Sequence, residues 1–108
     1  MYNLYNKIVM KVNLHAVNFN VDKKLVDFIQ EKVDKLEKYY DKIVSSDVFL
    51  KVENTSDKEN KVVEIKINVP GDDFVVKKNT KSFEEGIDLA VDSLERVLVK
   101  RKEKLRTI

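Results

Sequence analysis

The residues best suited to a chemical role in this sequence are cations gathered near its C-terminus. Residues 96–108 hold six cations and one carboxylate, a formal charge of +5, which leaves −3 for the rest of a chain whose total is +2. The cations are Arg96, Lys100, Arg101, Lys102, Lys104 and Arg106. Positive side chains concentrated at one end attract phosphate groups, whereas scattered lysines only keep a surface hydrated. The charge pattern therefore favours nucleic-acid binding without establishing it.

A ridge of cations is predicted on the last helix. At 100° per residue, Arg96, Lys100 and Lys104 lie one above another and face away from the apolar stripe of that helix. The helix dipole favours cations in a last turn, but its effect fades within that turn and does not explain Arg96 or Lys100. Arg101 lies at the edge of the apolar stripe, where its stem can pack, and Lys102 lies on the other flank. We expect these five side chains to contact RNA phosphates.

A second group of cations belongs to the first predicted helix. These candidate RNA-binding residues are Lys24, Lys35, Lys38 and Lys42. Carboxylates at Glu31, Asp34 and Asp41 dilute them. If the two helices lie side by side on one sheet face, their cationic flanks can line one positive groove, although the sequence does not show which way each flank faces. Because no exposed aromatic cluster is evident, such a groove would read RNA shape more than base order.

The sequence lacks the parts of an enzyme or a metal centre. It has no cysteine and one histidine, His15, which excludes thiolate sites and histidine clusters. It has no Gly-rich phosphate loop and no nucleophile elbow, and its carboxylates alternate with lysines at ordinary salt-bridge spacing. We expect no catalytic residue, no metal and no cofactor, and we interpret His15 as a surface residue at the end of a strand.

Alternating apolar residues predict four strands. The predicted strands are residues 8–14, 48–54, 62–69 and 73–78. The polar stretch 54–60 and the Pro-Gly turn at 70–73 predict hairpins that join the last three strands. Apart from Phe49 and Val62, the outward parity of these strands is polar, so we expect one face of the sheet to meet solvent.

Two amphipathic helices complete the pattern. Asp22 is placed as an N-cap, and apolar residues at three-and-four spacing continue to Ile43, which predicts one long helix. Ser82 and Glu85 can cap each other's backbone amides where the last helix begins. A crossover through the first helix lets the first two strands lie parallel. We therefore predict an α+β two-layer sandwich, β-α-β-β-β-α, with a four-stranded mixed sheet and two helices on one face.

A single domain accounts for the chain, because 108 residues that are 43% hydrophobic fill one core. We assign residues 10–108 to this domain and residues 1–9 to an N-terminal extension, which either lengthens the first strand or forms a loose tail. No apolar stretch reaches the roughly 18 residues of a membrane span, and the N-terminus lacks the features of a signal peptide. We expect a cytoplasmic protein that binds neither a membrane nor a small-molecule substrate.

Three segments resemble the ribosome hibernation-promoting and ribosome-associated inhibitor family. They are LEKYYDKI at 36–43, VFLKVEN at 48–54 and AVDSLERVLVKRKEKL at 90–105. The resemblance extends from about Met10 to the end of the chain and consists of helix and strand patterns. Through it, the family's basic positions fall on Arg96, Lys100, Lys102 and Lys104, with Lys24 and Lys35 also matched.

The resemblance implies a fold like a double-stranded RNA-binding domain, docked in the decoding channel of the small ribosomal subunit. There it would contact ribosomal RNA, block messenger and transfer RNA, and inhibit translation in stationary phase or stress. The chain resembles the short form of the family, which lacks the dimerisation domain of the long form, and we expect a monomer off the ribosome. Two alternatives remain: a general structured-RNA-binding or RNA-chaperone domain, and a protein-interaction module for an acidic partner.

Overall fold

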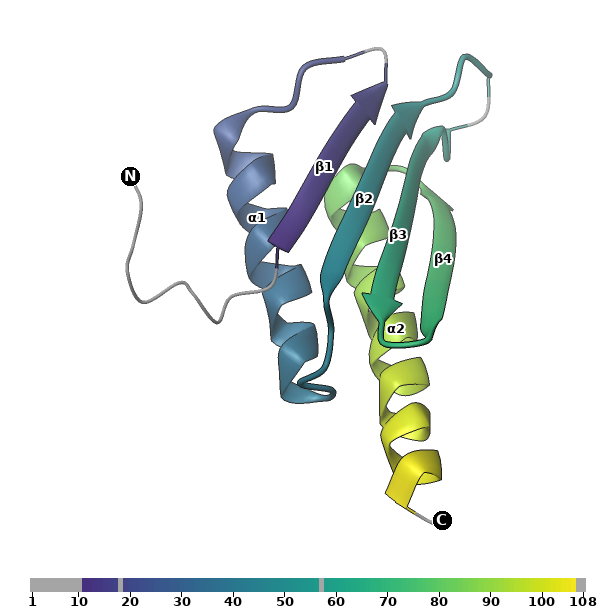
Figure 1. Ribbon diagram of the computed structural model, residues 1–108. Helices are drawn as coiled ribbons and strands as arrows, with labels where there is room; N and C mark the ends of the chain where they lie inside the picture. Colours follow the sequence, from purple (N-terminus) through teal and green to yellow (C-terminus); the bar gives the residue numbers. More distant parts are fainter. Residues whose placement is uncertain (1–10, 18, 57, 107–108) are drawn as a thin grey trace.

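Four strands and two long helices form two layers in the computed structural model (Figure 1). The structure describes residues 11–17, 19–56 and 58–106, so the predicted extension at 1–9 and the start of the predicted first strand lie outside the described residues. The elements are β1 (Lys11–Val17), α1 (Lys23–Asp34), a 3-10 helix η2 (Lys35–Lys38), β2 (Ser45–Val52), β3 (Lys61–Val69), β4 (Asp72–Thr80) and α2 (Phe83–Arg106). The predicted order β-α-β-β-β-α is confirmed.

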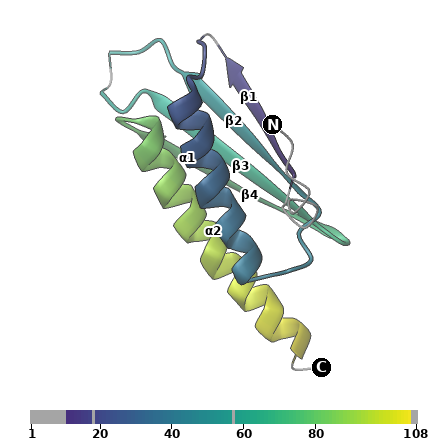
Figure 2. The same cartoon turned by 90° about the vertical axis from the view of Figure 1, so that its left-hand side faces the viewer.

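The sheet is mixed, with the strand order β1-β2-β3-β4. β1 pairs with β2 in parallel, and the two following pairs are antiparallel. A parallel pair needs a crossover, which α1 provides, whereas β3 and β4 are joined by a tight turn after Pro70. Gly71 in that turn has φ +81°, a left-handed conformation that glycine adopts without strain. Both helices cover the same face of the sheet, as predicted (Figure 2).

The core lies between this covered face and the helices. Val48, Leu50, Val63, Ile65 and Ile67 point inward from β2 and β3 and are fully buried, which confirms the predicted parity. Burial of such side chains contributes about 1.5–3 kcal/mol each. Within the described ranges no helix covers the opposite face of the sheet, and most of its side chains meet solvent as predicted, although Val62 is buried.

The first helix is shorter than predicted. Its N-cap is confirmed, because Asp22 Oδ1 accepts a hydrogen bond from the Leu25 amide at 2.9 Å. The α-helix ends at Asp34, however, and Tyr40 and Ile43 are buried beyond η2 without belonging to a helix. α1 and η2 rise about 26 Å together, close to the length of the neighbouring strands, whereas a helix continued to Ile43 would rise about 32 Å and overshoot the start of β2.

The second helix begins at the predicted residues, with the Ser82 half of the predicted reciprocal cap, and extends past the sheet. Ser82 Oγ accepts a hydrogen bond from the Glu85 amide at 3.2 Å. One turn later Gly86 lies so close to β3 that a Cβ there would be 2.6 Å from Val63 Cγ2. Leu98 is still fully buried, but the following turns of α2 run beyond the β3–β4 turn (Figure 1). The C-terminal part of α2 is therefore the part of this helix that the rest of the molecule covers least.

Candidate nucleic-acid interface

The cations predicted to form a ridge lie on this C-terminal half of α2. Arg96, Lys100, Lys102 and Lys104 are all exposed. Within the ranges that the structure describes, no carboxylate forms an ion pair with Arg96, Lys100 or Lys102. Arg96 donates one long hydrogen bond, to Ser93 Oγ at 3.4 Å. These three side chains keep most of their capacity to bind an external anion.

Arg101 is held differently from its neighbours. Its side chain is 24% exposed, and Nη1 donates to Asp72 Oδ2 at 2.9 Å. Nη2 donates to the Pro70 carbonyl oxygen at 3.3 Å, and the guanidinium carbon lies 5.6 Å from the centre of the Phe74 ring. The packed stem agrees with the sequence pattern, but the head contacts the β3–β4 turn instead of reaching into solvent.

A hollow of about 220 Å³ lies beside this arginine, between α2 and β4. It is lined by Asp72, Phe74, Val97, Lys100, Arg101 and Lys104. Two of the ridge lysines thus share a concave surface with two apolar side chains. Such a surface can contact both the phosphate and the sugar or base of a nucleotide.

The candidate cations of the first helix are exposed but are not on one helical flank. Lys24 lies in the first turn of α1, Lys35 and Lys38 belong to η2, and Lys42 follows in the turn before β2. None of the four forms an ion pair with another residue of the described ranges. Lys35, Lys38 and Lys42 form a second, looser group of cations near the end of the crossover, and Lys24 lies at its start.

The predicted positive groove between the helices is wrong. α2 faces α1 with carboxylates, because Asp88 pairs with Lys32 at 3.4 Å. Further along, the Tyr39 hydroxyl donates to Glu95, and this hydrogen bond together with the charge of Glu95 raises the pKa of Tyr39 above its ordinary value of 10.0. Asp88 and Glu95 are seven residues apart and share one flank of α2. Periodicity alone did not show that this flank, and not the lysine ridge, faces α1.

A ring pair on the open sheet face is a feature that sequence analysis did not predict. His15 of β1 and Phe49 of β2 are paired in register, and their rings stack at 4.7 Å with an angle of 14°. His15 is a half-exposed surface residue, as predicted, and its Nε2 lies 3.8 Å from Asp47 Oδ1. The alternation of apolar and polar residues places both side chains on the outward face of the sheet. The register that brings them side by side cannot be read from the sequence.

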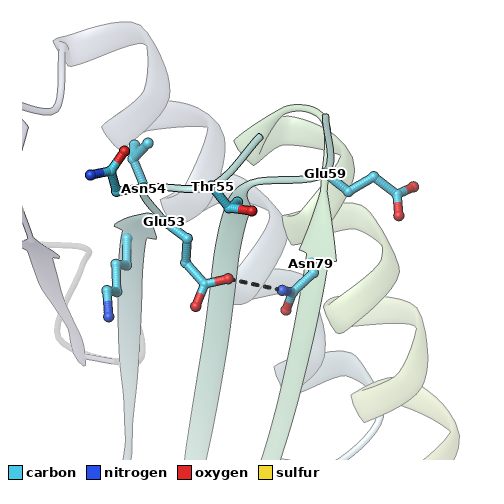
Figure 3. Close-up of a pocket in the computed structure, with 7 residues that line it drawn as sticks. Glu53, Asn54, Thr55, Glu59 and Asn79 are labelled. Carbon is cyan, nitrogen blue, oxygen red and sulfur yellow. Dashed lines mark hydrogen bonds between the residues drawn. The ribbon is translucent and has the colours of Figure 1, made fainter. Parts of the chain in front are cut away.

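A second, larger hollow is a poor site for phosphate. It measures about 430 Å³ and lies where β2 and β3 are connected (Figure 3). Its lining is Lys51, Val52, Glu53, Asn54, Thr55, Glu59 and Asn79, and Glu53 Oε1 accepts a hydrogen bond from Asn79 Nδ2 at 3.4 Å. Two carboxylates against one lysine repel an anion.

The described residues define a class of protein by their fold and surface. It is a two-layer α+β domain whose distinctive feature is a basic helix end. Among these residues no group of three or more histidine, cysteine or acidic side chains could hold a metal ion, and no helix is long and apolar enough to span a bilayer.

Comparisons with known proteins place the chain in a family. The family model described as Sigma 54 modulation protein / S30EA ribosomal protein matches residues 12–106. A ribosome hibernation promoting factor of Azotobacter vinelandii is 34% identical over 88% of this chain and 85% of its own length. That of Escherichia coli K12 is 31% identical over 90% and 98%. A solved ribosomal subunit interface protein from Coxiella burnetii has a TM-score of 0.76 at 18% identity, covers 87% of this chain and 99% of its own, and supports the fold alone.

The chain therefore belongs to the ribosome hibernation promoting factor family. Proteins of this family act in ribosome hibernation and the regulation of translation, and they are not enzymes. The predicted family and the predicted non-enzymatic role are confirmed by this membership.

Proposed function

We propose that this chain binds the small ribosomal subunit in its decoding channel through ribosomal RNA. By occupying that channel it blocks messenger and transfer RNA and inhibits translation in stationary phase or stress. In this proposal residues 10–108 act as one ribosome-binding domain, which is cytoplasmic and monomeric when free. The observation that supports it best is the group of exposed α2 cations, Arg96, Lys100 and Lys102, for which the described residues offer no carboxylate partner.

Unpaired cations bind RNA through the release of counterions. Each phosphate that a lysine or arginine neutralises frees condensed cations, so the logarithm of the binding constant falls with the logarithm of salt concentration by about 0.7–0.9 per contact. Lysines already paired with carboxylates contribute less, because binding must first break an internal pair. The α2 cations supply most of the expected salt dependence. Within the described ranges Lys24, Lys35, Lys38 and Lys42 also form no ion pair. They supply a smaller share because neighbouring carboxylates such as Asp34, Glu37 and Asp41 oppose their attraction for phosphate.

Charge reversal on α2 tests the proposal. Lys100→Glu with Lys104→Glu should abolish co-sedimentation with purified bacterial small subunits while circular dichroism shows an unchanged fold. The matched control is Lys58→Glu with Lys81→Glu, which changes the net charge equally at two exposed loop lysines. These lie in the β2–β3 loop and before α2, away from the C-terminal end of α2. Retained binding by the α2 variant, or equal loss in both variants, contradicts the proposal.

Three further measurements separate the proposal from its alternatives. Messenger and transfer RNA bound beforehand should exclude the chain from the subunit, since all three would occupy one channel. A general structured-RNA-binding domain would instead bind free duplex RNA as tightly as subunits. An acidic protein partner would give a salt dependence that does not fall in proportion to the number of cations removed.

A further inference from the structure

We propose that Arg101 and Asp72 form a latch that holds the cationic end of α2 in its RNA-binding position. Arg101 is then a positioning residue and not a phosphate contact. The inference rests on the proposed function for its assumption that the α2 lysines bind ribosomal RNA.

The contacts of Arg101 connect two segments that are distant in sequence. Its two terminal nitrogens donate to Asp72 Oδ2 at 2.9 Å and to the Pro70 carbonyl at 3.3 Å. The planar guanidinium can make both bonds at once, whereas the single ammonium of a lysine cannot match this fork. The acceptor is also fixed, because Asp72 Oδ1 accepts a hydrogen bond from the Asp73 amide at 2.8 Å.

The position of the latch along α2 allows it to fix the neighbouring lysines of the ridge. Leu98 is fully buried, and beyond it the helix runs past the sheet (Figure 1). Arg101 reaches from this part of the helix back to the β3–β4 turn, and it shares one hollow with Lys100 and Lys104. Holding this turn of the helix in place fixes both lysines relative to the sheet. Side chains that are already ordered lose less entropy when they bind.

The orientation of Arg101 argues against a direct phosphate contact. Nη1 and Nη2 donate within the protein, and Nε is buried without a hydrogen-bond partner among the described atoms. The guanidinium carbon also lies over the Phe74 ring. A phosphate would have to displace the Asp72 carboxylate from a short ion pair, whereas the ammonium of the neighbouring Lys100 is exposed.

Two substitutions of opposite charge should act in the same direction if the latch exists. Asp72→Asn removes a negative charge near the lysines, which by electrostatics alone would strengthen RNA binding. Arg101→Gln removes a positive charge. The latch predicts that each weakens binding to purified bacterial small subunits, by about two- to fivefold, the range of a partly exposed ion pair. The double variant should bind no more weakly than the weaker single variant, because both break one contact.

Two control variants and two further measurements make the test decisive. Asp73→Asn removes the adjacent carboxylate, which pairs with Lys66 at 3.7 Å, and should leave binding unchanged or slightly stronger. Asp72→Glu keeps a carboxylate and should retain binding. Amide hydrogen exchange in residues 99–104 should accelerate in Asp72→Asn and Arg101→Gln and not in Asp73→Asn, and the salt dependence of Arg101→Gln should keep the wild-type slope.

The outcomes that overturn the latch differ from those that overturn the proposed function. Stronger or unchanged binding by Asp72→Asn refutes the latch, as does a slope reduced by about one in Arg101→Gln, which would make Arg101 a phosphate contact. In either case the effect of reversing Lys100 and Lys104 would stand. Binding that survives this double reversal refutes the proposed function itself.

Discussion

The two helices of this domain carry similar charges and arrange them differently. In the crossover, acids and lysines alternate, so that Asp34 and Glu37 lie beside the candidate cations Lys35 and Lys38. In α2 the charges are separated along the axis. Residues 83–95 carry Glu84, Glu85, Asp88, Asp92 and Glu95, and residues 96–106 carry Arg96, Lys100, Arg101, Lys102, Lys104 and Arg106 with Glu103.

The separation of acidic and basic residues along α2 favours both the helix dipole and the contacts of α2 with the crossover. Acids near a helix N-terminus and cations near its C-terminus both interact favourably with the helix dipole. The acidic residues also contact the crossover, Asp88 through Lys32 of α1 and Glu95 through Tyr39 in the turn after η2. Net charge therefore says little about this protein, and the distribution of charge along one helix says much more.

The largest expected effect compares the two cationic groups directly. Lys100→Glu with Lys104→Glu should weaken binding to small subunits by about 100-fold or more, since two phosphate contacts become repulsive. Lys35→Glu with Lys38→Glu changes the net charge equally and should weaken binding by about tenfold or less. Fluorescence titrations at one fixed salt concentration measure both. Equal losses would show that the neighbouring carboxylates do not reduce the contribution of Lys35 and Lys38.

The next effect concerns the packed half of α2. Gly86→Ala should destabilise the protein by about 1–3 kcal/mol, because the new methyl group meets Val63 and overpacking outweighs the gain in helix propensity. Urea unfolding measures the change. The control is Val26→Ala at an exposed position of α1, which should stay within about 0.5 kcal/mol of wild type. A stabilised Gly86→Ala variant would mean that α2 can shift away from β3.

A smaller effect is expected at the bridge between the helices. Asp88→Asn removes the partner of Lys32 and should lower the free energy of unfolding by about 0.2–1 kcal/mol, the range of a half-exposed ion pair. The loss should shrink at high salt, where ion pairs are screened. Thermal unfolding at low and high salt tests this, and a loss that does not depend on salt would show that the charge of Asp88 is not what stabilises the contact between the helices.

The smallest effect lies at the end of α1. Burial raises the pKa of Asp34 above its ordinary value of 3.8, Glu37 adds to the increase, and the hydrogen bond from Gln30 opposes it. An acid whose pKa is raised by folding destabilises the protein when it is ionised. Asp34→Asn should therefore stabilise the protein at neutral pH by a few tenths of a kcal/mol, about the size of removing an acid from a helix C-terminus.

The pH dependence identifies the cause of that gain. It should be largest above the raised pKa and should disappear as the pH falls towards 3.8, where wild-type Asp34 becomes protonated. Asp27→Asn serves as the control, because Asp27 pairs with Lys23 at 2.7 Å and its loss should destabilise slightly. A gain in Asp34→Asn that is constant from neutral pH to below 3.8 would rule out the ionised carboxylate as the source.

The strands and the last helix were predictable because short-range patterns determine them. Alternating apolar residues identified the inward faces of β2 and β3, the Pro70-Gly71 pair marked the turn, and Ser82 marked the start of α2. The first helix was overextended for the same reason. Tyr40 and Ile43 keep the apolar spacing of a helix and are buried, although the backbone has already left it.

The arrangement of the site depended on contacts that no local pattern contains. Periodicity placed Arg101 at the edge of the apolar stripe, but its partner Asp72 is 29 residues away. The side of α2 that faces α1 is set by how both helices pack on the sheet. The sequence alone was compatible with either the acidic or the basic flank of α2 in that position. The individual RNA contacts of the lysines remain predictions.

The parallel pairing of β1 has a consequence for how the chain folds. Asn13 pairs with Asp47, 34 residues later, whereas β3 and β4 pair across a tight turn from Val69 and Asp72 outward. Closing a long loop loses more chain entropy than closing a short one, so pairings between distant residues form late. We expect pulse-labelled amides of β3 to become protected before those of β1. The strand that leaves the ribosome first during synthesis would then be the one that completes the sheet.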